Sequence, residues 1–252
     1  MRYNTIYEGD CILGLKKLAD KSVDVVFTSP PYNRLRDDKY SEYSDKIDDY
    51  LSFLKTFTEE CLRVSSRLVI INIQKNFYNK KDVFRFIGEY SENIQEIVIW
   101  EKTNPMPAAG KSITNSYEFF IMMSKNPIKA NSTYTKNIIA TSVNGDMTKE
   151  HKAVMKQDVS DWFIQTFTDE KEIILDCFMG LGTTAASAIK YGRKWIGFEI
   201  SPKYNEIAIT RLSQGSLSGF FGTQANSTSL SFNKDLTGSE NEPQILPLAE
   251  LR

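Results

Sequence analysis

Short apolar runs alternate with longer amphipathic stretches along most of this 252-residue chain. Apolar runs bounded by turn residues predict buried strands, and a repeat of three to four residues predicts helices with one buried face. The predicted strands are 5–7, 23–27, 68–73, 94–100, 117–123, 173–177 and 195–199, and the predicted helices are about 47–64, 82–90, 158–167, 183–191 and 202–212. Asp158 and Ser201 are the predicted N-caps of the helices that begin near 158 and 202. This alternation predicts an α/β fold with a mostly parallel sheet and helices on both faces.

Two regions lack this alternation. Residues 125–155 are polar and irregular, and between residues 111 and 157 seven lysines stand against three acidic residues, a net charge of plus four. An ordinary solvated surface explains such a charge as well as a polyanionic partner does. Residues 213–252 are rich in Ser, Gly, Asn and Thr, so we expect a flexible or loosely docked tail after a folded domain of residues 1–212.

Composition restricts the classes of function. The apolar runs are too short to cross a membrane, and the first residues, MRYNTIYEGD, contain no apolar export signal, so we expect a cytoplasmic protein. Cys11, Cys61 and Cys177 have no C-x-x-C spacing, which indicates reduced thiols. His151 is the only histidine, and we therefore expect neither a histidine-based metal site nor a Ser-His-Asp triad.

A glycine loop follows the predicted strand 173–177. Gly180 and Gly182 allow a ligand to approach the backbone closely, and the helix that starts at Thr183 offers free N–H groups. Glu199 ends the next predicted strand, where a carboxylate can accept both hydroxyls of a ribose. With Ala185, the segment also satisfies G-x-G-x-x-A, so by itself it leaves open an NAD-dependent oxidoreductase or a purely structural turn.

The sequence FTSPPYN, at 27–33, ends another predicted strand with two prolines and an aromatic residue. Prolines fix the backbone without adding a donor, so the Ser29 hydroxyl and the Pro30 carbonyl stand as acceptors, with Pro31 holding the turn. Tyr32 adds a flat face for stacking. This set suits a planar heterocycle with an exocyclic amine, since two acceptors aimed at the nitrogen favour its pyramidal, nucleophilic form and stabilise the positive charge that grows on it.

Together the two motifs resemble those of the DNA amino-methyltransferases that modify cytosine N4 or adenine N6. That family joins [DNS]-P-P-[YFW] to F-x-G-x-G-T, and this chain has SPPY at 29–32 and FMGLGT at 178–183. The order of the motifs resembles the β group of the family, over about residues 3–212. The resemblance implies a circularly permuted, S-adenosylmethionine-dependent methyltransferase fold of the Rossmann-like type, with a seven-stranded, mostly parallel sheet and one antiparallel strand.

The resemblance also implies the site residues, position by position. Ser29, Pro30, Pro31 and Tyr32 match the family's target-amine motif. The matches to its S-adenosylmethionine site are Asp10, Cys11, Asp176, Phe178, Gly180, Gly182, Thr183, Thr184 and Glu199. Trp100 with NPMP at 104–107 resembles a stretch near the target base, and residues 151–163 resemble a helix entry near the methionine carboxylate. Lys152 replaces the proline expected there, which leaves the role of His151 open.

Other activities fit less well. C5-cytosine methylation needs a nucleophilic cysteine, typically after a proline, and none of the three follows one. Protein-glutamine methyltransferases place the glycine loop first, and SPPY has no role in NAD chemistry. A catalytically silent DNA-binding relative would have no chemical need for Ser29, Gly180, Gly182 and Glu199. Ser in the target motif favours cytosine N4, with adenine N6 as the alternative.

Double-stranded DNA is the expected substrate, with the target base turned out of the duplex. We expect residues 126–155 to be a short target-recognition insert and residues 34–49 to be a mobile lid. The candidate DNA contacts are Arg34, Arg36, Lys111, Lys129, Tyr134, Lys136, Asn137 and Lys149. The shortness of the insert favours either a short recognition sequence or a homodimer, and the family resemblance adds a companion restriction endonuclease as a partner.

Overall fold

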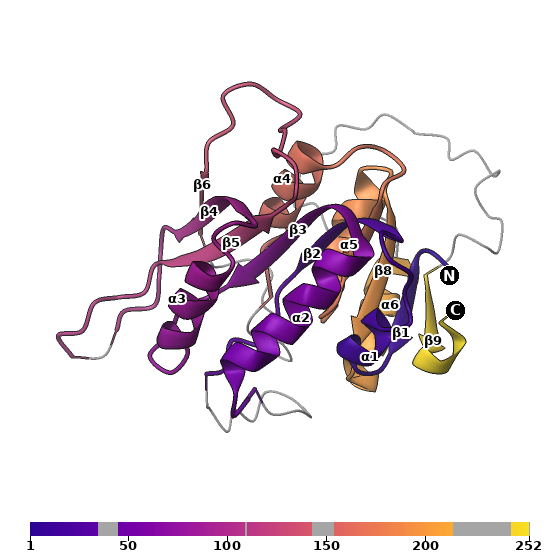
Figure 1. Cartoon of the computed structure of the whole chain (residues 1–252), viewed down its shortest axis with the longest axis horizontal. Helices are drawn as coiled ribbons and strands as arrows, with labels where there is room; N and C mark the ends of the chain where they lie inside the picture. The colour runs from indigo at the N-terminus through magenta and orange to yellow at the C-terminus, as the bar shows by residue number, and fades with distance from the viewer. Residues whose placement is uncertain (35–44, 109, 143–153, 214–242, 252) are drawn as a thin grey trace, which may run out of the picture.

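A single nine-stranded sheet forms the centre of the molecule, with the strand order β6-β4-β5-β3-β2-β7-β8-β1-β9 (Figure 1). The computed structural model describes residues 1–34, 45–108, 110–142, 154–213 and 243–251. The strands are β1 Thr5–Glu8, β2 Val23–Thr28, β3 Ser65–Ile73, β4 Ile94–Lys102, β5 Tyr117–Met123, β6 Ile138–Thr141, β7 Ile173–Asp176, β8 Lys194–Glu199 and β9 Gln244–Pro247.

All strand pairs are parallel except those made by β5, which is antiparallel to both β3 and β4. The seven strands predicted from the apolar runs are all present, and the single antiparallel one is the expected one. The circular permutation is visible in the pairing of β1 with β8, which aligns Ile6 with Gly197 although they come from opposite halves of the chain. The predicted fold class is confirmed.

Helices cover both faces of the sheet (Figure 1). One core cluster packs α1 Cys11–Leu15, α2 Tyr50–Val64 and α3 Lys80–Glu89 on the sheet, and the other packs α4 Gln157–Phe167, α5 Thr183–Lys190 and α6 Pro202–Ser213 on it. Ser201 precedes α6 as predicted, and its hydroxyl accepts the Tyr204 N–H at 3.3 Å. The prediction for Asp158 was wrong, because α4 begins at Gln157 after Lys156 and Asp158 lies in its first turn.

Two strands lie where the sequence predicted irregular chain. Ile138–Thr141, within the expected insert, forms β6 and extends the sheet beside β4. Near the end of the expected loose tail, β9 pairs in parallel with β1, and Leu251 is buried in the core. Residues 243–251 are therefore firmly docked. Residues 214–242 of the tail, like residues 35–44 of the expected lid and residues 143–153 of the insert, lie outside the described residues.

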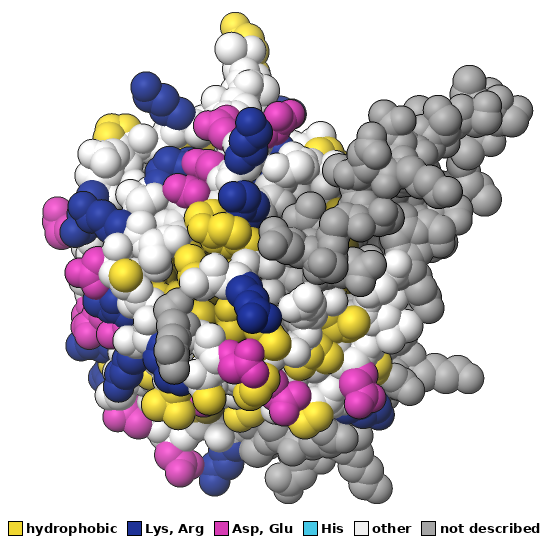
Figure 2. Space-filling view, turned by 90° about the vertical axis from the view of Figure 1, so that its right-hand side faces the viewer, with side chains coloured by type: hydrophobic (Ala, Val, Ile, Leu, Met, Phe, Trp, Pro, Cys, Tyr) yellow, Lys and Arg dark blue, Asp and Glu magenta, His cyan; other side chains and the backbone are white. Residues whose placement is uncertain are grey.

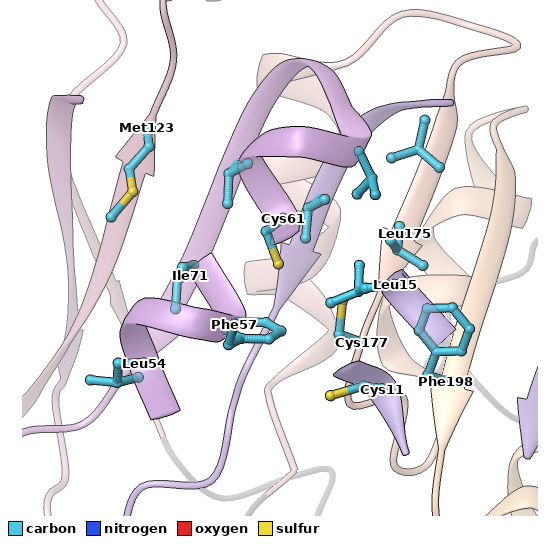
Figure 3. Close-up of a cluster of buried hydrophobic side chains, with 14 of the residues drawn as sticks. Cys11, Leu15, Leu54, Phe57, Cys61, Ile71, Met123, Leu175, Cys177 and Phe198 are labelled. Carbon is cyan, nitrogen blue, oxygen red and sulfur yellow. The ribbon is translucent and has the colours of Figure 1, made fainter. Parts of the chain in front are cut away.

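The three cysteines are free and buried, and they come together from three separate elements (Figure 3). The side chains of Cys61 on α2 and Cys177 after β7 contact each other, with Cys11 on the far side of Cys177. Burial raises the pKa of the Cys177 thiol well above its ordinary value, so it stays neutral. This packing makes the thiols part of the core.

The face on the β1–β9 side of the sheet mixes Lys and Arg with Asp and Glu around apolar side chains (Figure 2). The described part of this face therefore carries no one-signed charge of the kind that binds a polyanion. No helix among the described residues has the length and apolar character needed to span a bilayer.

Candidate active site

The candidate residues gather where the parallel strands end, at an edge of the sheet that we call the carboxyl edge. β7, β8 and β1 end there with Asp176, Glu199 and Glu8, and β2 ends with Thr28 just before the Pro-Pro loop, residues 29–33. Since β5 runs the other way, its first residues lie at the same edge, with Glu118 opposite Trp100 of β4. Ligands of open α/β sheets bind at this edge.

The backbone carbonyls of the Pro-Pro loop differ in whether they accept a hydrogen bond. The Pro31 carbonyl accepts the Tyr50 hydroxyl at 2.8 Å, and the Tyr32 carbonyl accepts the amide nitrogens of Asn76 and Asn79 at 2.8 and 2.7 Å. Within the described residues, no hydrogen bond reaches the carbonyl of Pro30. The loop is thus fixed just after Pro30, whose carbonyl has no hydrogen-bond partner among the residues that the structure describes.

Asn72 of β3 sets the direction of the Ser29 hydroxyl. Its Oδ1 accepts the Ser29 hydroxyl at 2.9 Å and the Tyr32 hydroxyl at 2.6 Å, while its Nδ2 donates to the Phe119 carbonyl at 3.1 Å. The bond to Phe119 fixes which end of the amide faces Ser29. Because Ser29 donates its one proton to Asn72, its lone pairs remain for a donor on the ligand side.

A buried ion pair completes the polar cluster. The Tyr32 hydroxyl lies 3.0 Å from Oε2 of Glu118, and the ammonium of Lys102, on β4, contacts the other oxygen of Glu118. The Lys102 ammonium also lies 5.2 Å from the centre of the Trp100 ring. Burial and the Glu118 carboxylate raise the pKa of Tyr32 well above its ordinary value, so the hydroxyl stays protonated. The ring of Tyr32 remains partly exposed while its hydroxyl is enclosed.

Thr28 joins the Pro-Pro loop to the glycine loop, residues 177–182. Its hydroxyl donates to Asp176 at 2.8 Å and accepts the Cys177 N–H at 3.1 Å. Asp176 also accepts from the Phe178 N–H and from the Thr184 side chain. Burial raises the pKa of Asp176, and these hydrogen bonds oppose that shift. The ends of β2 and β7, from which the two predicted motifs start, are therefore joined by hydrogen bonds.

The glycine loop needs its glycines. Gly180 and Gly182 have φ of 51° and 80°, the left-handed region that residues with a side chain rarely adopt. Glu199 holds the loop, since its Oε2 accepts the Gly180 N–H at 2.8 Å and its Oε1 accepts the Ser201 N–H at 2.9 Å. Burial raises the pKa of Glu199. The backbone of Ile200 also forms a hydrogen bond with this carboxylate, and since a carboxylate has about four acceptor sites, capacity remains for a ligand hydroxyl.

Other predicted site residues lie around this loop. The Gly9 N–H donates to the Glu199 carbonyl at 2.9 Å, which places Asp10 and Cys11 beside Glu199 at the start of α1. The ring of Phe178 packs 5.2 Å from that of the buried Phe57. Thr183 is buried, and its carbonyl accepts from Gln157 Nε2 at 3.3 Å. This bond brings the start of α4 to the glycine loop, and His151 lies outside the described residues.

The predicted DNA contacts do not come together at one place. Arg34 lies with its guanidinium 5.3 Å from the centre of the Tyr32 ring and donates to Gln74. Lys111 is exposed on the β4–β5 connection, at the carboxyl edge. Lys129, Tyr134, Lys136 and Asn137 belong to the β5–β6 connection, which leaves the sheet from the opposite, amino edge and rises at the top of Figure 1. Arg36 and Lys149 are outside the described residues.

Sequence reasoning missed Thr28, Asn72, Lys102 and Glu118, as well as the three side chains that hold the Pro-Pro loop, Tyr50, Asn76 and Asn79. A signal was present for two of them, since Asn72 is a polar residue within an apolar strand and Glu118 interrupts YEFFIMM. Buried polar groups require partners, so each marks a place where several elements meet.

Comparisons with known proteins identify a family of similar sequences. The family model of the N6/N4 DNA methylases, described as "DNA methylase", matches residues 23–210. Among curated proteins, the type II methyltransferase M.HinfI of Haemophilus influenzae is 30% identical over 84% of this chain and 68% of its own length. The type II methyltransferase M.BglII of Bacillus subtilis is 26% identical over 83% of this chain and 69% of its own.

Solved structures share the fold. The PvuII DNA methyltransferase, a cytosine-N4-specific enzyme, matches with a TM-score of 0.69 and 19% identity, over 86% of this chain and 91% of its own. M1.HpyAVI, solved with S-adenosylmethionine, matches with a TM-score of 0.61 and 22% identity, over 82% of this chain and 98% of its own. A DNA modification methylase of Thermus thermophilus, complexed with S-adenosyl-L-methionine, matches with a TM-score of 0.62 and 20% identity, over 83% of this chain and 95% of its own.

Proposed function

Because the chain belongs to the N6/N4 DNA methylase family, whose members are S-adenosylmethionine-dependent DNA amino-methyltransferases, we propose that it methylates N4 of a cytosine turned out of duplex DNA. The observation that carries the proposal is the pair of acceptors at the Pro-Pro loop. The Ser29 hydroxyl is directed by Asn72, and the Pro30 carbonyl has no hydrogen bond within the described residues although its neighbours do.

The residues at the glycine loop fit the cofactor. Two buried carboxylates, Asp176 and Glu199, end neighbouring strands, and Glu199 keeps free lone pairs for ribose hydroxyls. The left-handed Gly180 and Gly182 let the chain turn close to a ligand before α5 begins. S-adenosylmethionine supplies a methyl group activated by a positively charged sulfur. Asp10, Cys11, Phe178, Thr183 and Thr184 adjoin these residues and complete the proposed site.

Acceptors aimed at the exocyclic amine promote its attack. The amine of cytosine is a poor nucleophile because its lone pair is delocalised into the ring. Hydrogen bonds to Ser29 Oγ and to the Pro30 carbonyl favour the pyramidal nitrogen. Their dipoles would stabilise the positive charge that grows on it as the new N–C bond forms and the methyl–sulfur bond breaks, with the sulfur leaving as a neutral thioether. Ser29 is too weak a base to remove a proton first, so we infer that the amine loses its proton to solvent after the transfer.

Tyr32 supports the base by stacking. Its hydroxyl is held by Asn72 and Glu118, and its partly exposed ring offers a fixed face to the base. Serine as the first residue of the motif favours cytosine, and the choice rests on this residue, since the matching family contains both N6 and N4 enzymes. The names of the related proteins also support a role in restriction-modification, for which a companion endonuclease and a homodimer are the partners to assay.

The base is identified by mass spectrometry of nucleosides from unmethylated DNA incubated with the protein and S-adenosylmethionine. We expect N4-methylcytosine. N6-methyladenine would overturn the choice of base and keep the mechanism, whereas the absence of both products from cofactor-bound protein would overturn the proposed function.

The acceptor role of Ser29 has its own test. Ser29→Ala removes one acceptor, so we expect the transfer rate kcat to fall at least tenfold while calorimetry gives an unchanged affinity for S-adenosylmethionine. Ser91→Ala, at an exposed turn after α3, serves as the control and keeps the full rate. Loss of cofactor affinity in Ser29→Ala would show that Ser29 belongs to the cofactor site instead.

A further inference from the structure

Two loops flank the Pro-Pro loop at the carboxyl edge and expose large apolar side chains to solvent. The connection from β3 into the first residues of α3, residues 74–81 and called here the β3–α3 loop, exposes 75% of Phe77 and 54% of Tyr78. The β4–β5 hairpin, residues 103–116, exposes 88% of Met106 and 96% of Ile113. In Figure 1 this hairpin extends away from the sheet past α3. Such side chains lose free energy by remaining in water, so a clustered set indicates a contact surface.

The charge of these two loops is of one sign. Residues 74–81 contain Lys75, Lys80 and Lys81, residues 103–116 contain Lys111, and neither segment has an acidic residue. The ammonium of Lys80 lies 5.2 Å from the centre of the Phe77 ring, so a cation and an aromatic face are presented together. Lysines interleaved with exposed aromatics suit nucleic acid, because phosphates attract the cations and bases stack on the rings.

Both loops are fixed to the candidate active site. Asn76 and Asn79 of the β3–α3 loop donate to the Tyr32 carbonyl at 2.8 and 2.7 Å. The hairpin is tied to that loop, because Asn115 Nδ2 donates to the Lys75 carbonyl at 2.7 Å. Inside the hairpin, the Ala108 N–H donates to the Thr114 hydroxyl at 3.1 Å. A surface held in this way keeps a constant position relative to the Ser29 and Pro30 acceptors.

The first part of the expected recognition insert, before β6, lies elsewhere. Its described first part, the β5–β6 connection, starts at the amino edge, and Asn131 ties it to the end of α4 through the Thr166 carbonyl at 2.8 Å. Tyr134, which is 98% exposed, therefore projects from the side of the sheet away from Ser29.

We infer that the β3–α3 loop and the β4–β5 hairpin together form the surface that grips the DNA duplex around the target base. The inference rests on the proposed function and assigns its DNA contacts. Lys75, Lys80, Lys81 and Lys111 contact phosphates, and the apolar tips, Phe77, Met106 and Ile113, pack against the base pairs beside the extruded base. Apolar wedges at such positions offset the loss of stacking when a base leaves the duplex.

The apolar tips are tested with one DNA in two forms, an unmethylated amplified plasmid fragment and the same fragment made single-stranded by heating. We expect the triple variant Phe77→Ala, Met106→Ala, Ile113→Ala to methylate the duplex at least tenfold more slowly and the single strand within threefold of the unchanged protein. Tyr134→Ala is the matched control, an equally exposed side chain at the amino edge, and keeps both rates. Equal losses on both DNA forms, or a loss in Tyr134→Ala alone, would overturn the inference.

The lysines are tested by salt dependence. Replacing Lys75, Lys80 and Lys81 with Gln should weaken binding to the duplex and lower the slope of log affinity against log salt by about 0.9 for each phosphate that is no longer neutralised. The matched variant Lys129→Gln, Lys136→Gln should keep the slope, and the reverse result would assign DNA binding to the amino edge. If the unaltered protein methylates neither DNA form, the proposed function itself is wrong. If the unaltered protein is active and the variants do not differ from it, only the inference about the DNA-contact surface is wrong.

Discussion

At the scale of single residues, the Asn72 amide determines whether the neighbouring Ser29 hydroxyl faces a ligand as a hydrogen-bond donor or as an acceptor. A serine hydroxyl both donates and accepts, and only its partner determines which property faces the ligand. By accepting the Ser29 proton, Asn72 turns Ser29 into an acceptor. The Pro-Pro motif was visible in the sequence, whereas the residue that orients it lies on another strand and could not be paired with Ser29 by spacing.

Asn72→Leu tests this orientation. It removes the acceptor of the Ser29 hydroxyl and the donor to the Phe119 carbonyl, while the Tyr32 hydroxyl keeps Glu118 as a partner. Leaving these groups unpaired should lower the free energy of unfolding by roughly 1–3 kcal/mol. We expect kcat to fall about tenfold or more, since the Ser29 hydroxyl becomes free to rotate, while the affinity for S-adenosylmethionine measured by calorimetry stays the same. A normal kcat in a folded Asn72→Leu protein would contradict the role of Asn72.

The Lys102–Glu118 pair gives a second prediction at this scale. Both side chains are largely buried, so removing one partner leaves an uncompensated charge. Glu118→Gln and Lys102→Met should each lower the free energy of unfolding by roughly 3–5 kcal/mol. The double variant should recover part of that loss, because neither charge then remains. Urea unfolding of the four proteins measures the coupling, and strictly additive losses would show that the two groups act independently.

At the scale of elements, the apolar runs predicted β2, β3, β7 and β8 well because most of their residues are buried on both faces. β6 and β9 escaped prediction for a physical reason. Both are edge strands of four residues, and their burial is only partial, so their apolar pattern is weak. β9 also ends in Pro247, which a central strand would not tolerate but an edge strand does. Their strand conformation comes from the neighbours that they pair with.

Gly197 gives a prediction about how β8 packs against the glycine loop. A Cβ on Gly197 of β8 would lie 2.0 Å from Cε and 3.1 Å from Cγ of Met179, so Gly197→Ala forces the end of the Met179 side chain to move and presses on the part nearer the loop backbone. We expect a loss of roughly 1–3 kcal/mol in unfolding free energy and weaker binding of S-adenosylmethionine.

Gly88→Ala is the control for that variant. Gly88 lies in α3, and a Cβ there would meet nothing within 4 Å. Alanine in a helix should raise the free energy of unfolding by about 0.5–1 kcal/mol and leave cofactor binding unchanged. Thermal unfolding and calorimetry of both variants provide the comparison, and equal effects would show that Met179 does not link β8 to the loop.

At the scale of the whole molecule, the burial of Asp176 and Glu199 gives acidification two opposite effects: it favours folding of the cofactor-free protein and weakens binding of the cofactor. Burial raises the pKa of both carboxyls in the folded protein. A carboxyl with a raised folded pKa costs stability above that pKa, and the cost disappears as the pH falls through it to the ordinary value. Acidification therefore relieves this cost in the cofactor-free protein, whereas ribose hydroxyls need the ionised carboxylate as acceptor.

We therefore expect the affinity for S-adenosylmethionine, measured by calorimetry, to fall as the pH drops through the raised pKa of Glu199. Glu199→Gln should bind more weakly at neutral pH and lose most of that pH dependence, because the titrating group is gone. An unchanged pH dependence in Glu199→Gln would assign it to another group.

The position of β1 has a consequence for how the chain is made. β1 leaves the ribosome long before its two neighbours in the sheet, β8 and β9, because both lie far downstream of it in the chain. Until those strands are made, the backbone donors and acceptors of β1, and the side chain of Ile6, have no native partners. A chaperone that holds β1 would therefore act on the protein longer than on a fold whose neighbouring strands are made in succession.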